Sequence, residues 1–388
     1  MLPNKDLCTG CGMCKVACTC QCIDMNPDEY GFFYPDIDYS RCTFCNACED
    51  ACPVIHKVDV SQASQLFALK SVDEENRKNS SSGGAFFELA SEIIQNGGIV
   101  CAAGYNDDFS VVHKLANTIE EVYPLRGAKY SQSRFDQHFE EIRHNLQLGK
   151  KVLFVGTPCQ TAALYLNIDK HLQRTLILID LICHGVPSPL VFQKYLDEQS
   201  KVYAKGSPVK AVNLRDKTTG WSKYSYCVSI TFDNGITYQK KQSEDCFMQG
   251  FVNNLYLRSS CENCQFKGIE RCSDLTLGDY WGVWDEAPEF DDDKGVSLLI
   301  VHSLKGQKLW EDVQNRFSMI ESTEEQVVNY NPSAVVSSVA HPNKIEVLKM
   351  LDNKTSVQNA IQECLYSDNR KLNKFKLLKN KILKHRRG

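Results

Sequence analysis

The sequence predicts a mixed fold of α+β and α/β class. In it, a small cysteine-rich module precedes an α/β body with a mostly parallel sheet, a β-rich second half and a helical C-terminal tail. Three observations lead to this prediction. Two runs of four cysteines lie within the first 52 residues. Apolar segments alternate with helical ones between residues 66 and 201, as in parallel sheets covered on both faces. Beyond residue 208 the segments become β-like, and Asn234-Gly235 is a two-residue hairpin turn.

With 388 residues the chain is long enough for two or three domains. We divide it into a cysteine-rich module (1–57), an α/β domain (58–205), a β-rich domain (206–330) and a helical, basic tail (331–388). The module is too small to have much core of its own, so its stability should depend on bound metal.

In the α/β domain we expect strands at 66–72, 99–105, 110–117, 151–155 and 176–182, the second and third of which form a hairpin. Helices are expected over 85–94, with Ser82 as its cap, over 119–125 and 133–148, from after Gln160 to about 166, and over 188–201. In the second half we expect strands at 209–215, 224–232, 236–240, 275–281 and 296–302 and a helix over 245–257. The acidic loop 285–293 is interpreted as solvated surface, and the chain after residue 304 as mainly helical.

The charge balance gives no sign of nucleic-acid binding, because 48 acidic residues face 44 basic ones and the net charge is -4. The segment from Arg370 to Gly388 is an exception, with nine Lys and Arg and no acid. It could rest on an anionic membrane surface or a partner protein, or form a solvated terminal helix with one packed face. The chain opens MLPNKDLC without an apolar signal stretch and has no apolar run of spanning length. We therefore expect a cytoplasmic protein with reduced or metal-bound cysteines.

The two cysteine runs share the spacing C-x2-C-x2-C-x3-C, and Pro53 follows the second run. This is the two-cluster ferredoxin pattern, in which the fourth cysteine of each run ligates the other run's cluster. The predicted ligands are Cys8, Cys11, Cys14 and Cys52 for one [4Fe-4S] cluster and Cys42, Cys45, Cys48 and Cys18 for the second. A pair of structural zinc sites is the alternative. The first run departs from the pattern at Thr19, and the extra Cys20 and Cys22 are either additional ligands or spare buried thiols.

A third group, Cys261, Cys264 and Cys272, also indicates metal ligation, because three cysteines within twelve residues are unusual as core filler. No fourth cysteine lies next to these three in the sequence, so the fourth ligand must come from another segment. Cys159 and Cys183 both follow predicted strands, and such strand-to-helix loops face one crevice in a doubly wound sheet. We favour Cys183, with Cys159 and Cys246 as alternatives, and a third [4Fe-4S] cluster, with zinc as the alternative metal.

A possible phosphate-binding loop precedes the helix at 85–94. Ser80-Ser81-Ser82-Gly83-Gly84 offers hydroxyls and backbone N–H groups at a helix start, which suit a pyrophosphate. The same residues also make an ordinary helix cap, and neither G-x-G-x-x-G nor a Walker A sequence is present. Spacing alone therefore does not identify a flavin site.

Five segments follow one another behind the cysteine-rich module: SSSGGAFFELASEII, RGAKYSQS, VGTPCQTAAL, DLICHGVPSP and CENCQFKG with RCSDLTLGDYWG. Together they resemble the family of coenzyme F-420 hydrogenase/dehydrogenase beta subunits, and more narrowly its bacterial ferredoxin-fused members, often linked with polysaccharide biosynthesis. The resemblance spans residues 1 to about 310 and leaves the C-terminal helices uncovered.

The resemblance implies FAD as a two-electron cofactor that exchanges electrons with the clusters. It implies FAD-phosphate contacts from Ser81, Ser82, Gly83 and Gly84, and flavin contacts from Lys129, Ser131, Gly156, Thr157 and Pro158. Lys129 could stabilise a reduced flavin, although a loop lysine is by default a solvated surface residue. His184 could donate a proton near the flavin, or could hydrogen-bond the backbone of its own turn.

The favoured function is an FAD and iron-sulfur oxidoreductase that passes electrons between a ferredoxin-like or deazaflavin donor and a small-molecule substrate. Two alternatives stay open: an electron-transfer subunit without its own substrate pocket, and a redox-sensing or assembly protein with structural clusters. The sequence identifies neither the substrate, nor the direction of electron flow, nor the donor, nor the oligomeric state.

Overall fold

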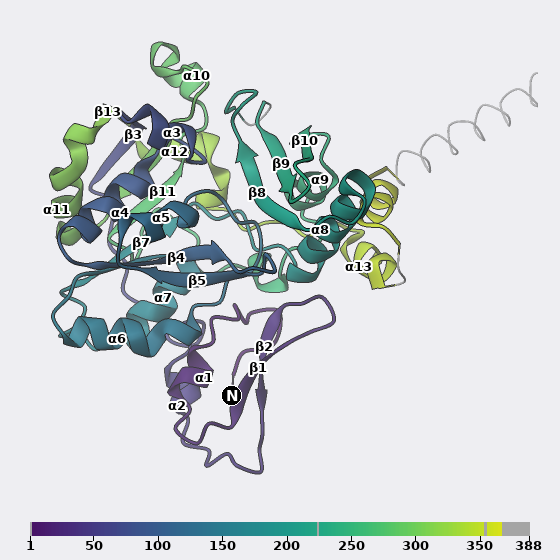
Figure 1. Ribbon diagram of the computed structural model, residues 1–388. Helices are drawn as coiled ribbons and strands as arrows, with labels where there is room; N and C mark the ends of the chain where they lie inside the picture. The colour runs from purple at the N-terminus through teal and green to yellow at the C-terminus, as the bar shows by residue number, and fades with distance from the viewer. Residues whose placement is uncertain (1, 223–224, 353–354, 367–388) are drawn as a thin grey trace, which may run out of the picture.

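The computed structural model describes residues 2–222, 225–352 and 355–366, and the body it shows is built on an eight-stranded sheet (Figure 1). The strand order is β13-β3-β12-β11-β7-β6-β4-β5. The bounds are β3 Gln65–Ser71, β4 Ile99–Tyr105, β5 Val111–Ala116, β6 Val152–Val155, β7 Leu176–Leu181, β11 Leu275–Asp279, β12 Ser297–Val301 and β13 Phe317–Glu321.

The sheet is mixed, whereas the sequence predicted a mostly parallel one. Strands β11, β7, β6 and β4 run parallel, and the flanking pairs β4–β5, β11–β12, β12–β3 and β3–β13 are antiparallel. The reason is that β11 and β12, which the sequence placed in a β-rich domain of their own, pair with β7 and β3 of the body. Strand β13 was not predicted, since only Phe317 of its five residues is buried and its alternation is too weak to recognise.

Helices cover both faces of the sheet, and the central strands show why their sequences are apolar throughout. Leu153 and Val155 of β6 pack in one core cluster with α4 (Ala85–Gln95) and α11 (Leu304–Val313). Val152 and Phe154 face the other way, toward α6 (Phe139–Gln147) and α7 (Pro158–Asn167). A strand that is buried on both sides has no polar face, so its sequence does not alternate between apolar and polar residues.

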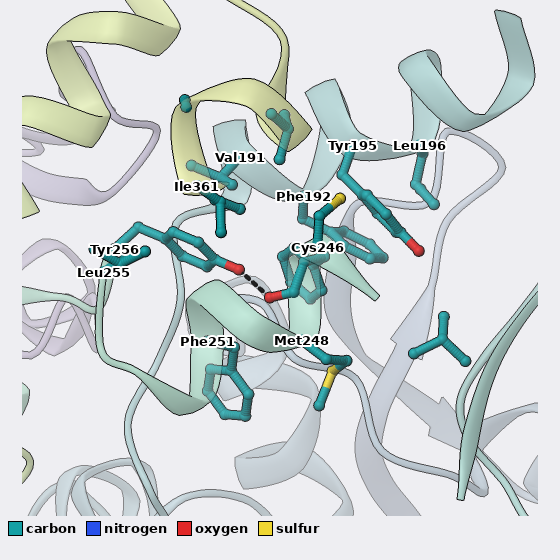
Figure 2. Packing of buried hydrophobic residues seen from close by; sticks show 14 of the residues in the cluster. Val191, Phe192, Tyr195, Leu196, Cys246, Met248, Phe251, Leu255, Tyr256 and Ile361 are labelled. Carbon is teal, nitrogen blue, oxygen red and sulfur yellow. Dashed lines mark hydrogen bonds between the residues drawn. The ribbon is translucent and has the colours of Figure 1, made fainter. Parts of the chain in front are cut away.

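Three antiparallel strands form a separate sheet in the order β10-β9-β8, with bounds β8 Val209–Asp216, β9 Cys227–Phe232 and β10 Thr237–Lys241. They pack with α8 (Pro189–Ala204), α9 (Cys246–Val252) and α13 (Lys344–Asp352) around a second core. Figure 2 shows aromatic side chains of this cluster, in which the hydroxyl of Tyr256 donates to the carbonyl of Phe247. Cys246, an alternative ligand in the sequence analysis, is buried in this core.

The cysteine-rich module contains α1 (Met13–Ala17), β1 (Ile23–Pro27), β2 (Phe33–Ile37) and α2 (Ala47–Asp50) and lies below α6 and α7 in Figure 1. Met13 and Ala51 are buried in the same cluster as Phe135 and Phe139 of the body. The amide of Asn167, at the end of α7, also donates to the carbonyl of Ala51 at 2.9 Å. The module is therefore packed against the body and is not tethered by its linker alone.

The remaining helices are short or peripheral, with bounds α3 Glu74–Lys78, α5 Ile119–Val122, α10 Val283–Glu286 and α12 Glu324–Tyr330. The acidic loop 285–293 is more structured than predicted, because Asp292 pairs with Arg77 and Asp293 accepts from the main chain of Trp221 at 2.8 Å. Within the described ranges, no helix is both long enough and apolar enough to span a membrane. The basic segment from Arg370 to Gly388 lies outside the described residues.

Asp245 is the polar centre of the second core, and we predict that Asp245→Ala destabilises the protein. Its fully buried carboxylate accepts from the hydroxyls of Tyr195 (2.6 Å) and Tyr238 (2.7 Å) and caps α9 through the main chain of Met248 (2.8 Å). Losing the cap and leaving two buried hydroxyls unpaired should cost about 3 kcal/mol.

The measurement is the apparent thermal midpoint of the anaerobic protein at a fixed scan rate. The matched control is Asp233→Ala in the exposed β9–β10 turn, for which we expect a change within about 0.5 kcal/mol. Equal midpoints for the two variants would contradict the role given to Asp245.

Candidate iron-sulfur and flavin sites

Cys8, Cys11, Cys14 and Cys52, the predicted ligands of one cluster, line a single cavity in the module. We call them the first site. Gly12 has a φ of +82° and a Cβ there would lie 2.5 Å from the Cβ of Asp136, so both the turn and the contact with the body require glycine. Burial, followed by the nearby Cys8 and Cys52, raises the pKa of Cys11 to about 12. Burial also raises the pKa values of Cys14 and Cys52. A positively charged iron core in this cavity would stabilise the thiolates that the four cysteines present to it.

The predicted second site is formed by Cys18, Cys42, Cys45 and Cys48. Three of them, Cys18, Cys42 and Cys48, border a small apolar cluster that also contains Cys22, while Cys45 is exposed. The left-handed Asn46, with a φ of 63°, turns the chain into α2 as Gly12 turns it into α1. The turn into the helix is thus the same at the two sites.

The two extra cysteines of the first run lie at the second site. Cys22 is 4% exposed, and its Sγ lies 3.4 Å from the Sγ of Cys18. Hydrogen bonding to Cys18 raises the pKa of the Cys22 thiol. Cys20 lies on the other side, 3.3 Å from the hydroxyl of Thr43. The sequence left open whether Cys20 or Cys22 is a metal ligand. In the structure both cysteines lie at the second site, so this is the site to which either would contribute.

A third group of thiols comes together where two parallel strands end. Cys159 begins α7 after β6 and Cys183 follows β7, while Cys261 and Cys264 lie in and after the 3-10 turn Ser259–Cys261. Burial, then the adjacent Cys261, raises the pKa of Cys183 to about 12. Burial, then the adjacent Cys264, also raises the pKa of Cys159 well above its usual value. We call Cys159, Cys183, Cys261 and Cys264 the third site.

Hydrogen bonds hold the ligand loops of the third site. The backbone N–H of Val186 points at the Sγ of Cys261 at 3.4 Å, and the hydroxyl of Thr157 lies 3.2 Å from the Sγ of Cys159. The backbone N–H of Cys264 donates to the hydroxyl of Ser337 at 3.1 Å.

Among the described residues, no three His, Cys, Asp or Glu side chains form a group that could hold a metal ion. A cubane spreads its four ligands over four irons, so its thiolates stand further apart than those on one zinc.

Cys272, which the sequence grouped with Cys261 and Cys264, lies apart from them in the structure. It lines a separate cavity together with Pro53, Lys57, Pro158, Asp180 and Lys267. Burial, followed by the nearby Asp180, raises the pKa of Cys272 to about 12. In the structure Cys159 is near Cys183, Cys261 and Cys264, whereas Cys272 lines the neighbouring cavity. Whether Cys272 or Cys159 is the ligand is tested by the pair of substitutions given below.

The three segments expected to contact FAD are neighbours. The hydroxyl of Ser81 accepts from the backbone N–H of Ala128 at 2.8 Å, which joins the serine-glycine loop to the segment containing Lys129 and Ser131. The amide of Gln160 donates to both the carbonyl and the hydroxyl of Ser133 at 3.1 Å, which joins Gly156-Thr157-Pro158 to the same segment. These contacts fit a single continuous binding surface.

The serine-glycine loop is partly used by the fold itself. Gly84, with a φ of +94°, is the N-cap of α4, and Ser82, the predicted cap, donates to the carbonyl of Val296 at 2.7 Å. The backbone N–H of Gly83 donates to the hydroxyl of Ser297 at 2.9 Å, and a Cβ on Gly83 would lie 2.2 Å from the carbonyl of Leu69. Packing alone therefore explains why residue 83 is a glycine. The half-exposed Ser81 and Ser82 are better placed than Gly83 to bind a phosphate.

Lys129 is not a solvated surface residue. Its ammonium donates to the carbonyls of Leu125 (2.8 Å), Arg126 (2.8 Å) and Gly127 (3.2 Å), and burial lowers its pKa to about 7. It lies 5.7 Å from the ring centre of Tyr105, whose buried hydroxyl has no hydrogen-bond partner among the described residues. Buried hydroxyls in proteins normally have a hydrogen-bond partner, and a bound ligand is one candidate partner for Tyr105.

His184 is held by neighbouring segments and not by its own turn. Its Nε2 lies 2.6 Å from the side-chain oxygen of Asn254, and its Nδ1 lies 3.4 Å from the hydroxyl of Ser333. Burial lowers the pKa of the imidazole, so the neutral form dominates near pH 7. The edge-on ring of Phe251 lies between His184 and Tyr130, which is next to Lys129. A catalytic role for His184 stays a prediction.

Two parts of the chain match known protein domains. Residues 7–55 match the 4Fe-4S dicluster domain, and residues 149–326 match the family described as the C terminus of the coenzyme F420 hydrogenase/dehydrogenase beta subunit. The chain is 24% identical over 256 residues to the F subunit of the F(420)H(2) dehydrogenase of Methanosarcina mazei, a match that covers 63% of this chain and 72% of that protein. A stretch of 58 residues is 41% identical to the I subunit of the NADH-quinone oxidoreductase of Pelobacter propionicus, covering 13% of this chain and 31% of that one.

A solved structure of the F420-reducing [NiFe] hydrogenase complex from Methanosarcina barkeri, derivatised with xenon, contains a chain that is similar at 17% identity with a TM-score of 0.46. The match covers 79% of this chain and 93% of that one. The family resemblance and the iron-sulfur assignment of the N-terminal segment, both predicted from the sequence, are confirmed by the two domain matches.

The two candidate ligands Cys159 and Cys272 can be separated by a matched pair of substitutions. We predict that Cys159→Ala loses about four iron and four sulfide per chain, because one cubane ligand is gone, whereas Cys272→Ala keeps them. The measurement is iron and sulfide per chain after anaerobic purification. The opposite result would return Cys272 to the third site.

Proposed function

We propose that this chain is an iron-sulfur flavoprotein that transfers electrons within a redox assembly. It carries the 4Fe-4S dicluster domain together with the C-terminal domain of the coenzyme F420 hydrogenase/dehydrogenase beta subunit. Three [4Fe-4S] clusters and one FAD are the proposed cofactors. The two relatives named above are themselves subunits of a dehydrogenase and an oxidoreductase, which favours a subunit that works with protein partners.

One observation carries the proposal: a single loop after β6 serves both the third site and the expected flavin surface. Thr157 and Pro158 are expected flavin contacts, and Cys159, the next residue, is a thiol of the third site. On the other side, Arg258 contacts Cys8 of the first site and lies three residues before Cys261. These contacts support a third site between the module and the expected flavin surface, as a relay requires.

The residues of the chain would divide the work as follows. The thiols hold iron, whose clusters supply one-electron transfer, and FAD when bound supplies exchange between single electrons and pairs. Ser81 and Ser82 would orient the phosphates, and Lys129 would present positive charge to the flavin or its phosphates. The four thiols of the third site are half-buried, so water has only limited access to the sulfurs.

A second candidate is an enzyme with its own small-molecule substrate at the flavin, accepting electrons from a ferredoxin-like or deazaflavin donor. The unpaired hydroxyl of Tyr105 favours it, as does the Nε of Arg215, which is also buried without a hydrogen-bond partner in the described structure. Arg215 otherwise pairs with Asp279 at 2.8 Å and lies beside Tyr130. Two unused donors near Lys129 would suit a polar, anionic substrate.

The cofactor content tests the proposal directly. We expect anaerobically purified wild-type protein to contain about twelve iron, about twelve sulfide, no stoichiometric zinc and one FAD per chain. About eight iron with one zinc would contradict a cluster at the third site. Iron without any flavin would contradict the flavin surface but leave the relay of clusters in place.

Lys129 gives a pH-dependent prediction. Its pKa is lowered to about 7, so the ammonium loses its proton as the pH rises from 6 to 8. The affinity for FAD, an anion, should therefore be higher at pH 6 than at pH 8, and Lys129→Met should bind about tenfold more weakly at pH 6. In the same pH range the affinity of Lys129→Met should be nearly constant.

The measurement is FAD titration by flavin fluorescence at several pH values. Lys201→Met, on the exposed side of α8, is the control and should keep the wild-type profile. A wild-type affinity that does not change between pH 6 and pH 8 would remove Lys129 from the site.

A further inference from the structure

Arg258 connects the cysteine-rich module to the third site, and no motif pointed to it. Its side chain is 1% exposed and is among the largest that are fully buried. Its backbone N–H donates to the carbonyl of Val186 at 2.8 Å, and its carbonyl accepts from Cys261 at 3.0 Å. The residue is thus fixed at the start of the turn that carries a third-site thiol, while its side chain reaches into the module.

The guanidinium makes hydrogen bonds to neutral acceptors. It donates to the carbonyls of Cys8 (2.8 Å) and Phe33 (2.9 Å) and to the side-chain oxygen of Gln132 (3.2 Å). One of its nitrogens also lies 3.8 Å from the Sγ of Cys8, and its carbon lies 4.1 Å from the ring centre of Tyr34. Each of these partners except the sulfur is uncharged near neutral pH.

The other buried arginines differ in this respect. Arg77 pairs with Asp292, Arg215 with Asp279 at 2.8 Å, and Arg271 with Asp180 at 3.2 Å. Within the described ranges, no carboxylate pairs with Arg258. An unpaired charge in a protein interior is strongly unfavourable, so a buried arginine of this kind needs a counter-ion.

We propose that the counter-ion of Arg258 is the iron-sulfur cluster of the first site, and that Arg258 is a positioning residue that raises the reduction potential of this cluster. The inference rests on the proposed iron-sulfur content. A cubane with four thiolate ligands is negatively charged, and the electron that reduces it makes it more so. A fixed, buried cation beside the Cys8 sulfur therefore stabilises the reduced form more than the oxidised form.

The surroundings of Arg258 are built to keep it in place. A Cβ on Gly10 would lie 3.0 Å from the guanidinium carbon and 2.6 Å from the side-chain nitrogen of Gln132. The side-chain oxygen of Gln132 also accepts from the backbone N–H of Phe33 at 3.3 Å. Gly10 in the first cysteine run is thus needed both for its turn and for the approach of Arg258.

The test is a dithionite titration of the complete, anaerobically purified chain, followed by electron paramagnetic resonance at fixed potentials. The first-site signal is identified as the one altered in Cys14→Ala. In Arg258→Gln we expect the ratio of reduced to oxidised first-site cluster at a fixed potential to fall about tenfold, which is a shift of about 59 mV to lower potential for a one-electron couple. Arg258→Lys keeps the charge and should stay much closer to wild type.

The matched control is Arg41→Gln. Arg41 is exposed and donates to the carbonyl of Cys20 at 3.1 Å, near the second site, so the first-site potential should not move. An unchanged first-site potential in Arg258→Gln, or an equal shift in Arg258→Lys, overturns the inference. Loss of the first cluster from both variants also overturns it, because lysine carries the same charge. Wild-type protein without iron would instead refute the proposed function.

Discussion

The structure depends on burying thiols that are stable as thiolates only when iron is bound. Burial is the largest influence on Cys11 of the first site and on Cys183 of the third site, and it raises the pKa of both thiols. Each neighbouring thiol adds to this effect, since two negative sulfurs repel each other. A cationic iron core would remove this repulsion and bind the thiolates together. Folding of the module and loading of iron are therefore one process in thermodynamic terms.

The parallel part of the sheet explains why the sites lie next to each other. Strands β6 and β7 are adjacent and parallel, so the loops at their carboxyl ends open at the same edge. One loop carries Gly156, Thr157, Pro158 and Cys159, and the next carries Cys183. Because the proposed cofactor-binding residues directly follow the ends of adjacent strands, the spacing of the sheet sets the distance between them. Efficient electron transfer needs fixed, short distances of this kind.

The sequence was most informative where the chemistry is local. The spacing of the cysteine runs predicted the first site, because all but one of its thiols lie within seven residues. Strand-to-helix topology led to Cys183 and Cys159. Closeness in sequence also grouped Cys272 with Cys261 and Cys264; in the structure Cys272 lines a neighbouring cavity, and its role as a ligand stays a prediction. Other features could not be predicted from the sequence. Lys129 looked like a surface lysine because its partners are backbone carbonyls, which no residue pattern reveals. Arg258 contacts Cys8 across a separation of 250 residues, and the mixed sheet likewise results from a long-range pairing of β12 with β3. Each depends on how distant segments meet, so their signals are absent from any short window of sequence.

The contrast between Arg258 and the other buried arginines bears on how the relay is tuned. A carboxylate beside Arg258 would satisfy the guanidinium, but the resulting pair would be nearly neutral and would exert little field on the first site. It would also add an acid close to a cluster that becomes more negative on reduction. With neutral acceptors alone, the geometry of the guanidinium is fixed while its full charge remains available to the cluster.

The same arrangement joins cofactor loading to assembly. The contacts of Arg258 with Cys8, Phe33 and Tyr34 exist only when the module is docked, and its charge is compensated only when the first site holds a cluster. An empty module would leave a cation unpaired in the interface with the body, so docking should favour loaded modules. The connection between the first and third sites would then be completed only in chains able to conduct electrons.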